Sequence, residues 1–240
     1  MNSVNGLRTK IFADGADLSA IRALRANPLI KGFTTNPTLM RVAGIDDYEA
    51  FSKDVIEVVD GAPVSLEVFA DEFDAMEAQA KVIASWGRNV FVKIPVTNTK
   101  GQSSAPLVKR LADQGVQVNV TAIFTLEQVR EVTDALADDV AANVSVFAGR
   151  VADTGVDPVP HMREAVQIVA SKPKAEVIWA SPRELLNLFH ADEAGCHIIT
   201  VTSGILDKLN LIGKDLTEYS LETVEMFRRD AVAAAYKINV

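Results

Sequence analysis

Residues 89–96 read Asn-Val-Phe-Val-Lys-Ile-Pro-Val. Apolar side chains occupy alternate positions at Val90, Val92 and Ile94, a pattern typical of a strand with one covered face. Because successive side chains of a strand point to opposite faces, Lys93 is expected to point away from that apolar cover. A lysine facing the interior of a sheet protein predicts a functional site rather than a plain structural strand.

Seven further segments of this kind follow one another along the chain, with amphipathic helical patterns between them. The predicted strands are Lys10–Asp14, Gly32–Asn36, Val64–Phe69, Asn89–Val96, Gln117–Ile123, Asn143–Ala148, Glu176–Ser181 and His197–Thr202. Clear helical patterns cover Asp71–Ser85, Ser104–Gln114, Leu126–Leu136 and Pro158–Ala170. Strand-then-helix repetition favours a parallel sheet. Eight such units in 240 residues predict an α/β fold, a single (β/α)8 TIM barrel.

One domain is expected over residues 1–240, because no linker rich in Gly, Ser or Pro divides the chain. An extra amphipathic C-terminal helix is expected at about 217–237, after the eighth unit. Two interpretations of this helix remain open. It either caps its own barrel or packs on a neighbouring subunit of a homo-oligomer.

Composition limits the possible partners. The net charge is -8, which makes nucleic acid and anionic membranes poor candidates. Cys196 is the only cysteine, so no intrachain disulfide can form. Residues 1–10 are polar and no apolar run reaches the ~18 residues that span a bilayer, so a cytoplasmic location is expected. An anionic substrate would need a few well-placed Arg or Lys side chains.

Alternation assigns the strand residues to two faces. One set is apolar and is expected under the helices; in the fifth strand it comprises Val118, Val120 and Ala122. The opposite set faces the barrel lumen and carries Glu67, Lys93, Asn119, Thr121 and Ser145, while Asp14 and Ser181 end the first and seventh strands. Active sites of such barrels lie at the carboxyl ends of the strands, where these residues fall.

Lys93 and Glu67 have two interpretations. As a buried ion pair they would be weak evidence for stability, and the neighbouring amide and hydroxyl groups would have no purpose. As a catalytic pair they suit Schiff-base chemistry. Phe91 and Phe147 are expected to supply apolar surroundings that favour the neutral, nucleophilic amine. Proton transfers would then need a carboxylate and a water held by Glu67 and Thr121.

This chemistry needs no metal and no cofactor. The three histidines, His161, His190 and His197, are scattered and lack ligand spacing. His197 is expected to be packed rather than catalytic.

Six short motifs carry a family resemblance. They are Phe12-Ala13-Asp14, Thr34-Thr35-Asn36-Pro37, Val92-Lys93-Ile94-Pro95-Val96-Thr97, Asn119-Val120-Thr121, Ser145-Val146-Phe147-Ala148-Gly149-Arg150 and Ala180-Ser181-Pro182-Arg183. In this order, each at a predicted strand end, they resemble the transaldolase and fructose-6-phosphate aldolase family over about residues 12–209.

The resemblance implies a role for each matching residue. Lys93 would form the Schiff base, Asp14 would handle the sugar hydroxyl proton, and Glu67 and Thr121 would hold the catalytic water. The implied substrate-binding residues are Asn36, Asn119 and Ser145 for the dihydroxyacetone hydroxyls, Arg150, Ser181 and Arg183 for a phosphate, and Thr34 and Phe147 beside them. Thr34 is expected to face the same side as Asn36, and Thr35 to be packed. A guanidinium pair suits a phosphate because its fork matches the oxygens.

The implied activity is transfer of a dihydroxyacetone unit from a ketose phosphate to an aldose phosphate. Family members that instead cleave and release dihydroxyacetone resemble one another in having glutamine and tyrosine at the positions of Glu67 and Phe147, which favours transfer here. A catalytically silent barrel is the alternative of another class. Pro182 stands where related sequences often carry an aromatic residue, and proline has no N–H to give an anion. A related sulfonated sugar is therefore a second possible substrate.

Overall fold

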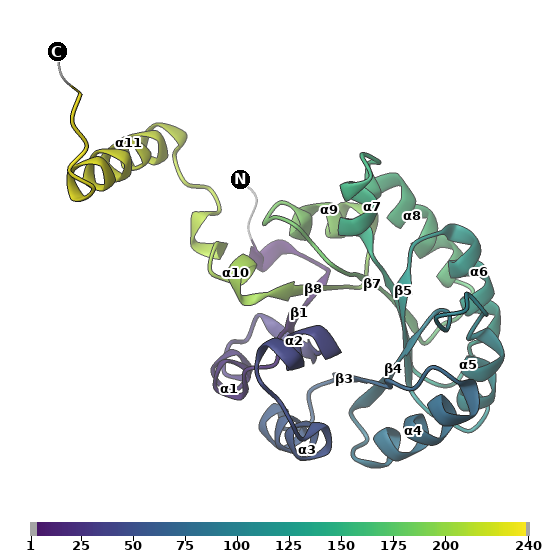
Figure 1. The fold of residues 1–240 in the computed structure, drawn as a ribbon. Coiled ribbons are helices and arrows are strands. Elements are labelled where there is room, and N and C mark those ends of the chain that lie inside the picture. The colour runs from purple at the N-terminus through teal and green to yellow at the C-terminus, as the bar shows by residue number, and fades with distance from the viewer. Residues whose placement is uncertain (1–3, 239–240) are drawn as a thin grey trace.

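The eight predicted strands form a closed parallel barrel in chain order (Figure 1). The computed structural model describes residues 4–238. The strands are β1 Lys10–Asp14, β2 Ile30–Thr34, β3 Val64–Glu67, β4 Val90–Pro95, β5 Val118–Ile123, β6 Ala142–Val146, β7 Ala175–Trp179 and β8 Ile198–Thr202. β8 pairs with β1, which closes the sheet. The predicted (β/α)8 fold is confirmed.

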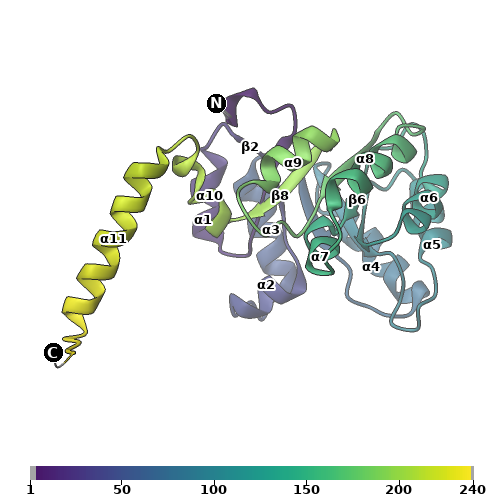
Figure 2. The ribbon, with the colours of Figure 1, turned by 90° about the horizontal axis from the view of Figure 1, so that it is seen from above.

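Helices surround the barrel and connect its strands (Figure 2). They are α1 Leu18–Arg25, α2 Pro37–Val42, α3 Tyr48–Val59, α4 Phe73–Ser85, α5 Ala105–Ala112, α6 Leu126–Ala135, α7 Ala148–Asp153, α8 Pro158–Val169, α9 Asn187–Ala194, α10 Ser203–Leu206 and α11 Leu216–Ala233. Two short 3-10 helices, Val4–Gly6 and Leu209–Leu211, complete the described elements.

β2 begins and ends two residues earlier than the sequence predicted. Asn36 is the N-cap of α2, where its side chain accepts a hydrogen bond from the Leu39 amide at 2.9 Å. Pro37 follows at the first helical position, which suits its fixed φ. A capping asparagine followed by proline therefore ends the strand before residue 36.

β5 breaks the expected alternation near its end. Ala122 has a φ of 60°, in the left-handed region, and the register with β6 shifts between Val120 and Ile123. Ile123 is consequently fully buried in the core shared with Val118 and Val120. Ala122 is only partly buried and packs against this core, while a bulge that inserts one residue places Ile123 in the fully buried position.

The apolar interior is divided in two. The larger core lies between the strands and the helices and contains the predicted set of Val64, Leu66, Val90 and Val92. A smaller cluster, formed by Phe12, Ile178, Ala180 and Ile198 with Phe147 packed against it, is separate. Gly32 makes room for this cluster, because a Cβ there would lie 2.5 Å from the Phe12 ring. The small cluster therefore lies inside the barrel, apart from the core under the helices.

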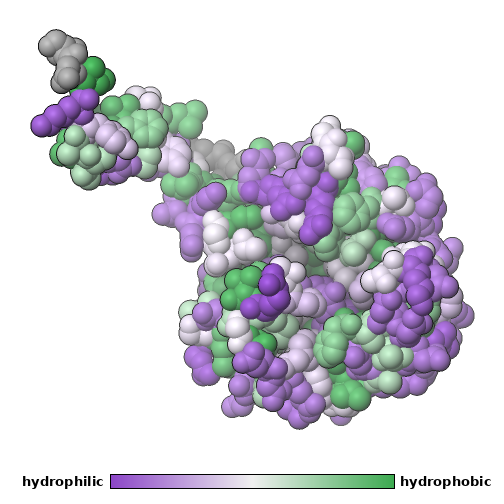
Figure 3. Space-filling view, viewed as in Figure 1, coloured by the Kyte–Doolittle hydropathy of each residue, from purple (hydrophilic) through white to green (hydrophobic). Residues whose placement is uncertain are grey.

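The predicted C-terminal helix is present as α11, but it does not cap its own barrel. It projects away from the body of the molecule (Figures 1 and 2), and none of its residues is buried. Leu221, Val224 and Phe227 are each more than half exposed. Figure 3 shows apolar residues along this projecting segment. Across residues 4–238, no helix combines the length and the apolar character needed to cross a membrane.

Candidate active site

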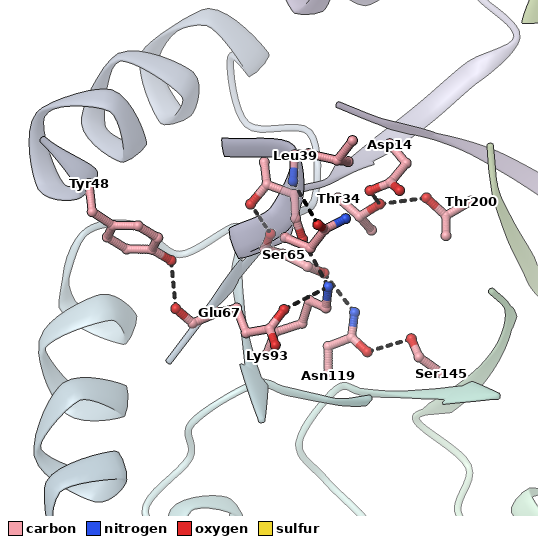
Figure 4. A network of polar contacts seen from close by, with 12 residues as sticks. Asp14, Thr34, Leu39, Tyr48, Ser65, Glu67, Lys93, Asn119, Ser145 and Thr200 are labelled. Carbon is pink, nitrogen blue, oxygen red and sulfur yellow. Dashed lines mark hydrogen bonds and ion pairs between the residues drawn. The ribbon is translucent and has the colours of Figure 1, made fainter. Parts of the chain in front are cut away.

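Lys93 lies at the centre of the polar cluster inside the barrel mouth (Figure 4). It faces the lumen near the end of β4, as predicted, and only 8% of its surface is exposed. Its Nζ lies 3.0 Å from Glu67 Oε2 and donates to the Thr35 carbonyl oxygen at 2.8 Å. Parallel pairing of β3 with β4 places Glu67 directly beside Lys93. The amine therefore has a carboxylate partner that can accept its proton.

Asp14 lies on the other side of the lumen, at the end of β1. Its carboxylate accepts a hydrogen bond from Thr34 Oγ1 at 2.7 Å. Thr34 Oγ1 in turn lies 2.5 Å from Thr200 Oγ1 on β8. Burial raises the pKa of Asp14, and the negative charge of Glu67 acts in the same direction. The positive charge of Lys93 and the Thr34 hydrogen bond only partly oppose that rise.

A second hydrogen-bonded chain crosses three strands. Asn119 Nδ2 donates to Ser65 Oγ at 2.9 Å, and Ser145 Oγ donates to Asn119 Oδ1 at 2.7 Å. All three side chains are at least 97% buried. A satisfied network of this kind holds its members in fixed orientations. The structure thus brings the predicted residues Asn119 and Ser145 together.

Asn36 and Thr121 flank these networks in different ways. Asn36 Oδ1 is occupied by the α2 cap, so its amide nitrogen is the atom left for a ligand. Thr121 is 3% exposed and lies opposite Pro95 in the pairing of β4 with β5. Glu67 lies on β3 and Thr121 on β5, so β4 with Lys93 runs between them.

The predicted anion-binding residues lie in α7 and in the segment after β7, at the rim of the barrel. Gly149 allows α7 to touch the segment after β7, because a Cβ there would lie 1.6 Å from the Ser181 carbonyl oxygen. Ser181 has a φ of 58°, an uncommon conformation for a residue with a side chain. The Arg150 guanidinium lies 5.6 Å from the centre of the Phe147 ring. The close approach of Gly149 to the Ser181 carbonyl oxygen thus brings Arg150 and Ser181 to the same part of the rim.

Arg183 is not free at this rim. Its guanidinium makes a two-point ion pair with Asp153, in which Nε donates to Oδ1 at 3.1 Å and the second contact joins Nη2 to Oδ2. Asp153 ends α7, one turn after Arg150. About half of each side chain is exposed. The remaining N–H groups of Arg183 are available to a ligand.

Four residues near the site were not among the sequence candidates. Ser65 and Thr200 take part in the two lumenal chains, and Asp153 pairs with Arg183. The fourth, Tyr48 on α3, donates to the main-chain oxygen of Glu67 at 2.7 Å. Burial, together with the nearby Glu67 charge, raises the pKa of Tyr48, which favours a neutral donor. Alternation along β3 and β8 could have indicated the first two residues.

The remaining titratable candidates have other environments. His197 lies just before β8, where its Nδ1 accepts from the Val177 amide at 3.0 Å and burial lowers its pKa. Cys196 is buried, which raises the pKa of its thiol to about 12 and disfavours a nucleophilic thiolate. No group of three His, Cys, Asp or Glu side chains within the described part of the chain is arranged to hold a metal ion.

Fold and site together define a class: a (β/α)8-barrel enzyme with its polar groups gathered at the carboxyl ends of the strands. The family model for Transaldolase/Fructose-6-phosphate aldolase matches residues 11–238. The chain therefore belongs to the transaldolase/fructose-6-phosphate aldolase family, and the family resemblance of the motifs is confirmed.

Relatives agree with this assignment. A probable transaldolase 2 from Listeria monocytogenes is 36% identical over 201 residues, covering 83% of this chain and 88% of its own length. A probable transaldolase from Methanococcus maripaludis is 34% identical over 222 residues, covering 89% and 99%.

Solved structures with much lower identity share the fold. A putative lyase/mutase from Burkholderia cenocepacia has a TM-score of 0.60 at 16% identity, covering 96% of this chain and 88% of its own. KGPDC from Streptococcus mutans has a TM-score of 0.56 at 10% identity, covering 83% and 90%. At these identities the likeness extends to the barrel fold alone.

Proposed function

We propose that this enzyme is a transaldolase that acts through a Schiff base on Lys93. It would transfer a dihydroxyacetone unit from a ketose phosphate, such as fructose 6-phosphate, to an aldose phosphate, such as erythrose 4-phosphate. The observation that carries the proposal is the buried contact of 3.0 Å between Lys93 Nζ and Glu67, with Asp14 in the same lumen. A buried ion pair alone would be poor stabilisation, whereas a reactive amine needs such a proton acceptor.

Schiff-base formation begins when Glu67 takes a proton from Lys93. The neutral amine then attacks the ketose carbonyl carbon to give a carbinolamine. Protonation of the carbinolamine hydroxyl releases water and leaves an iminium on Lys93. Glu67 and Thr121 are proposed to hold that water, which is needed again when the product leaves.

Cleavage then breaks the C3–C4 bond of the sugar. Asp14 takes the proton of the C4 hydroxyl, and the electrons of that O–H bond form the carbonyl group of the departing aldose. The C–C bond electrons move toward the iminium and leave a three-carbon enamine on Lys93. Addition of the enamine to an acceptor aldehyde reverses these steps, so Asp14 returns the proton.

Recognition is assigned to two layers of residues. Asn36, Asn119 and Ser145 are proposed to bind the dihydroxyacetone hydroxyls, supported by the fixed orientations of Asn119 and Ser145. Arg150, Ser181 and Arg183 are proposed to bind the phosphate, supported by the close approach of α7 to the segment after β7.

Borohydride trapping tests the proposal directly. The intact protein is incubated with fructose 6-phosphate and sodium borohydride, and its mass is measured. A single adduct of one reduced dihydroxyacetone or hexose unit is expected, and peptide mapping should place it on Lys93. A silent binding protein would give no adduct, and an adduct on another lysine would move the nucleophile.

The alternative is a fructose-6-phosphate aldolase-type activity, which cleaves the sugar and releases dihydroxyacetone. The residue at position 147 is expected to influence which of the two activities dominates. Phe147 has no hydroxyl to protonate the enamine, which favours transfer over release of dihydroxyacetone. Phe147→Tyr should therefore raise release without acceptor several-fold relative to transfer to erythrose 4-phosphate. Phe124→Tyr is the matched control, since its ring packs 5.7 Å from that of Phe147. If the wild type releases dihydroxyacetone as fast as it transfers it, the enzyme is an aldolase and the transaldolase proposal is wrong.

A transaldolase for a sulfonated sugar is a second candidate with an observation in its favour. Pro182 offers no amide hydrogen at the rim. The Asp153 carboxylate also offsets the charge of Arg183, which suits a singly charged anion better than a doubly charged phosphate. Initial rates with a matched pair of phosphorylated and sulfonated ketoses decide between these anions.

We also propose that the enzyme is a homo-oligomer joined through α11. An 18-residue helix with no buried residue gains little stability from its own barrel. Sedimentation of the full chain and of a variant with Leu221, Val224 and Phe227 replaced by serine tests this. The unsubstituted chain is expected to sediment as a larger species than the variant. Equal masses for the two proteins would contradict the proposed role of α11.

A further inference from the structure

Thr200 takes part in the site through a hydroxyl chain that ends on Asp14 (Figure 4). It lies on β8, is 7% exposed, and faces the lumen beside Phe12, its pairing partner on β1. Its Oγ1 lies 2.5 Å from Thr34 Oγ1, and Thr34 Oγ1 donates to Asp14 Oδ1 at 2.7 Å. The chain thus links β8, β2 and β1 across the floor of the site.

The direction of this chain follows from counting hydrogens. A threonine hydroxyl has one hydrogen, and Thr34 gives its hydrogen to the Asp14 carboxylate, which can only accept while ionised. The hydrogen between the two threonines must therefore come from Thr200. Thr200 donates to Thr34, Thr34 donates to Asp14, and each bond strengthens the next by polarisation.

We propose that Thr200 is a positioning residue for the proton transfer of Asp14, acting through Thr34. This inference rests on the proposed aldol chemistry of Asp14. With Thr200 in place, Thr34 is fixed as a donor to Oδ1, so Oδ2 is the oxygen that takes the proton from the sugar C4 hydroxyl. The O–H electrons form the carbonyl of the departing aldehyde, and the same proton leaves Oδ2 for the acceptor in the return step.

Loss of the Thr200 hydroxyl should disturb this step in two ways. Thr34 could rotate and accept from a protonated Oδ1, which would hold the proton on the oxygen away from the substrate. The Asp14 carboxylate would also lose part of its stabilisation, so its ionised form would be reached only at higher pH. The charged groups that act on Asp14, Lys93 from β4 and Glu67 from β3, stay in place in such a variant.

The variant that tests this is Thr200→Val, which removes the hydroxyl at nearly constant volume. We expect kcat for cleavage to fall about five- to tenfold, in line with the loss of one buried hydrogen bond between neutral hydroxyls, and the acid limb of its pH profile to move to higher pH. Borohydride trapping on Lys93 should remain, because Schiff-base formation precedes the Asp14 step. Thr200→Ser keeps the hydroxyl and should restore both kcat and the pH profile.

Two controls separate this role from a structural one. Thr133→Val removes another buried hydroxyl, which bonds only to Val129 within α6, and should leave kcat and the pH profile unchanged. A Thr34→Val background should abolish the effect of Thr200→Val, because Thr200 then has no route to Asp14. Thr200→Ala replaces the valine variant if the latter does not fold.

Each outcome decides something. Wild-type kcat and pH profile in Thr200→Val, or an undiminished effect in the Thr34→Val background, would overturn the role of Thr200 while the transaldolase proposal stands. A wild type that forms no borohydride adduct would overturn the proposed chemistry, and the inference with it. A lowered kcat with a shifted acid limb, rescued by serine, supports the assignment.

Discussion

The site contains two ion pairs of the same chemical kind in opposite surroundings. In the lumen, the Lys93 and Glu67 side chains are 10% and 14% exposed. At the rim, the Arg183 and Asp153 side chains are 49% and 53% exposed. Water screens the rim pair, so it contributes at most about 1 kcal/mol to folding stability. The buried charges interact strongly, and removing one would leave the other unpaired in the interior.

We expect this difference to separate the chemical step from substrate recognition. The buried pair places an amine and a carboxylate 3.0 Å apart, which suits a covalent step. The exposed pair leaves free N–H groups at the entrance, which suits capture of an anionic end of the substrate. Changes in the lumen should therefore alter kcat, and changes at the rim should alter KM.

Lys93→Met is expected to have the largest effect. Turnover should fall by more than about a thousandfold, because Lys93 is the amine beside Glu67 at the carboxyl ends of the strands, where the Schiff base is proposed to form. Coupled assays of dihydroxyacetone transfer measure this loss. Removing Lys93 also leaves Glu67 buried without its partner, which should destabilise the barrel by about 3–5 kcal/mol.

The double variant Lys93→Met/Glu67→Gln is the control for that instability. It removes the unpaired charge and should regain much of the unfolding free energy in urea while staying inactive. Residual turnover above a thousandth of wild type in either variant would assign the nucleophile elsewhere.

Arg183→Ala should have the next largest effect, and only on binding. KM for phosphorylated ketoses should rise about ten- to a hundredfold, the loss of one charge-assisted contact of roughly 1.5–3 kcal/mol. The KM for unphosphorylated fructose and the kcat should change little. An equal rise for both substrates would show that Arg183 does not contact the phosphate.

Asp14→Asn should increase stability on the order of 1 kcal/mol, as changes at strained functional sites often do. Burial raises the pKa of Asp14 above its ordinary value of 3.8, so the folded state holds this proton more tightly than the unfolded state. Wild-type stability is then lost as pH rises above 3.8 through the folded-state pKa. Urea unfolding of both proteins from pH 3 to pH 8 should show a gap that opens with rising pH. A constant gap would contradict this linkage.

The lumenal layer could be predicted largely from strand alternation. Apolar residues on every second position placed Lys93 and Glu67 on the inner face, and the structure pairs them. Ser65 and Thr200 follow from the same rule, since each lies an even number of residues from a lumenal neighbour. The fully buried position of Ile123 could not be predicted, because the positive φ of Ala122 changes the alternation without changing the sequence pattern.

The rim was less predictable because it depends on how α7 packs against the segment after β7. The motifs indicated Arg150 and Arg183, but the contact between Gly149 and the Ser181 carbonyl arises from tertiary packing. Asp153 gave no signal, since an acidic residue at the end of a helix is usually solvated. Its partner Arg183 is 30 residues away in the chain.

Asp153→Ala should have the smallest effect, and it tests whether the exposed pair positions Arg183. Without the carboxylate, the guanidinium can adopt more rotamers, and binding must then restrict them. KM for phosphorylated ketoses should rise two- to fivefold, in line with an exposed pair worth at most about 1 kcal/mol, while kcat stays unchanged. Glu184→Ala removes an equal charge beside Arg183 without breaking its ion pair and should leave KM nearly constant. A KM that falls in Asp153→Ala would mean that the carboxylate competes with the substrate anion, so the rim pair would weaken binding instead of orienting Arg183.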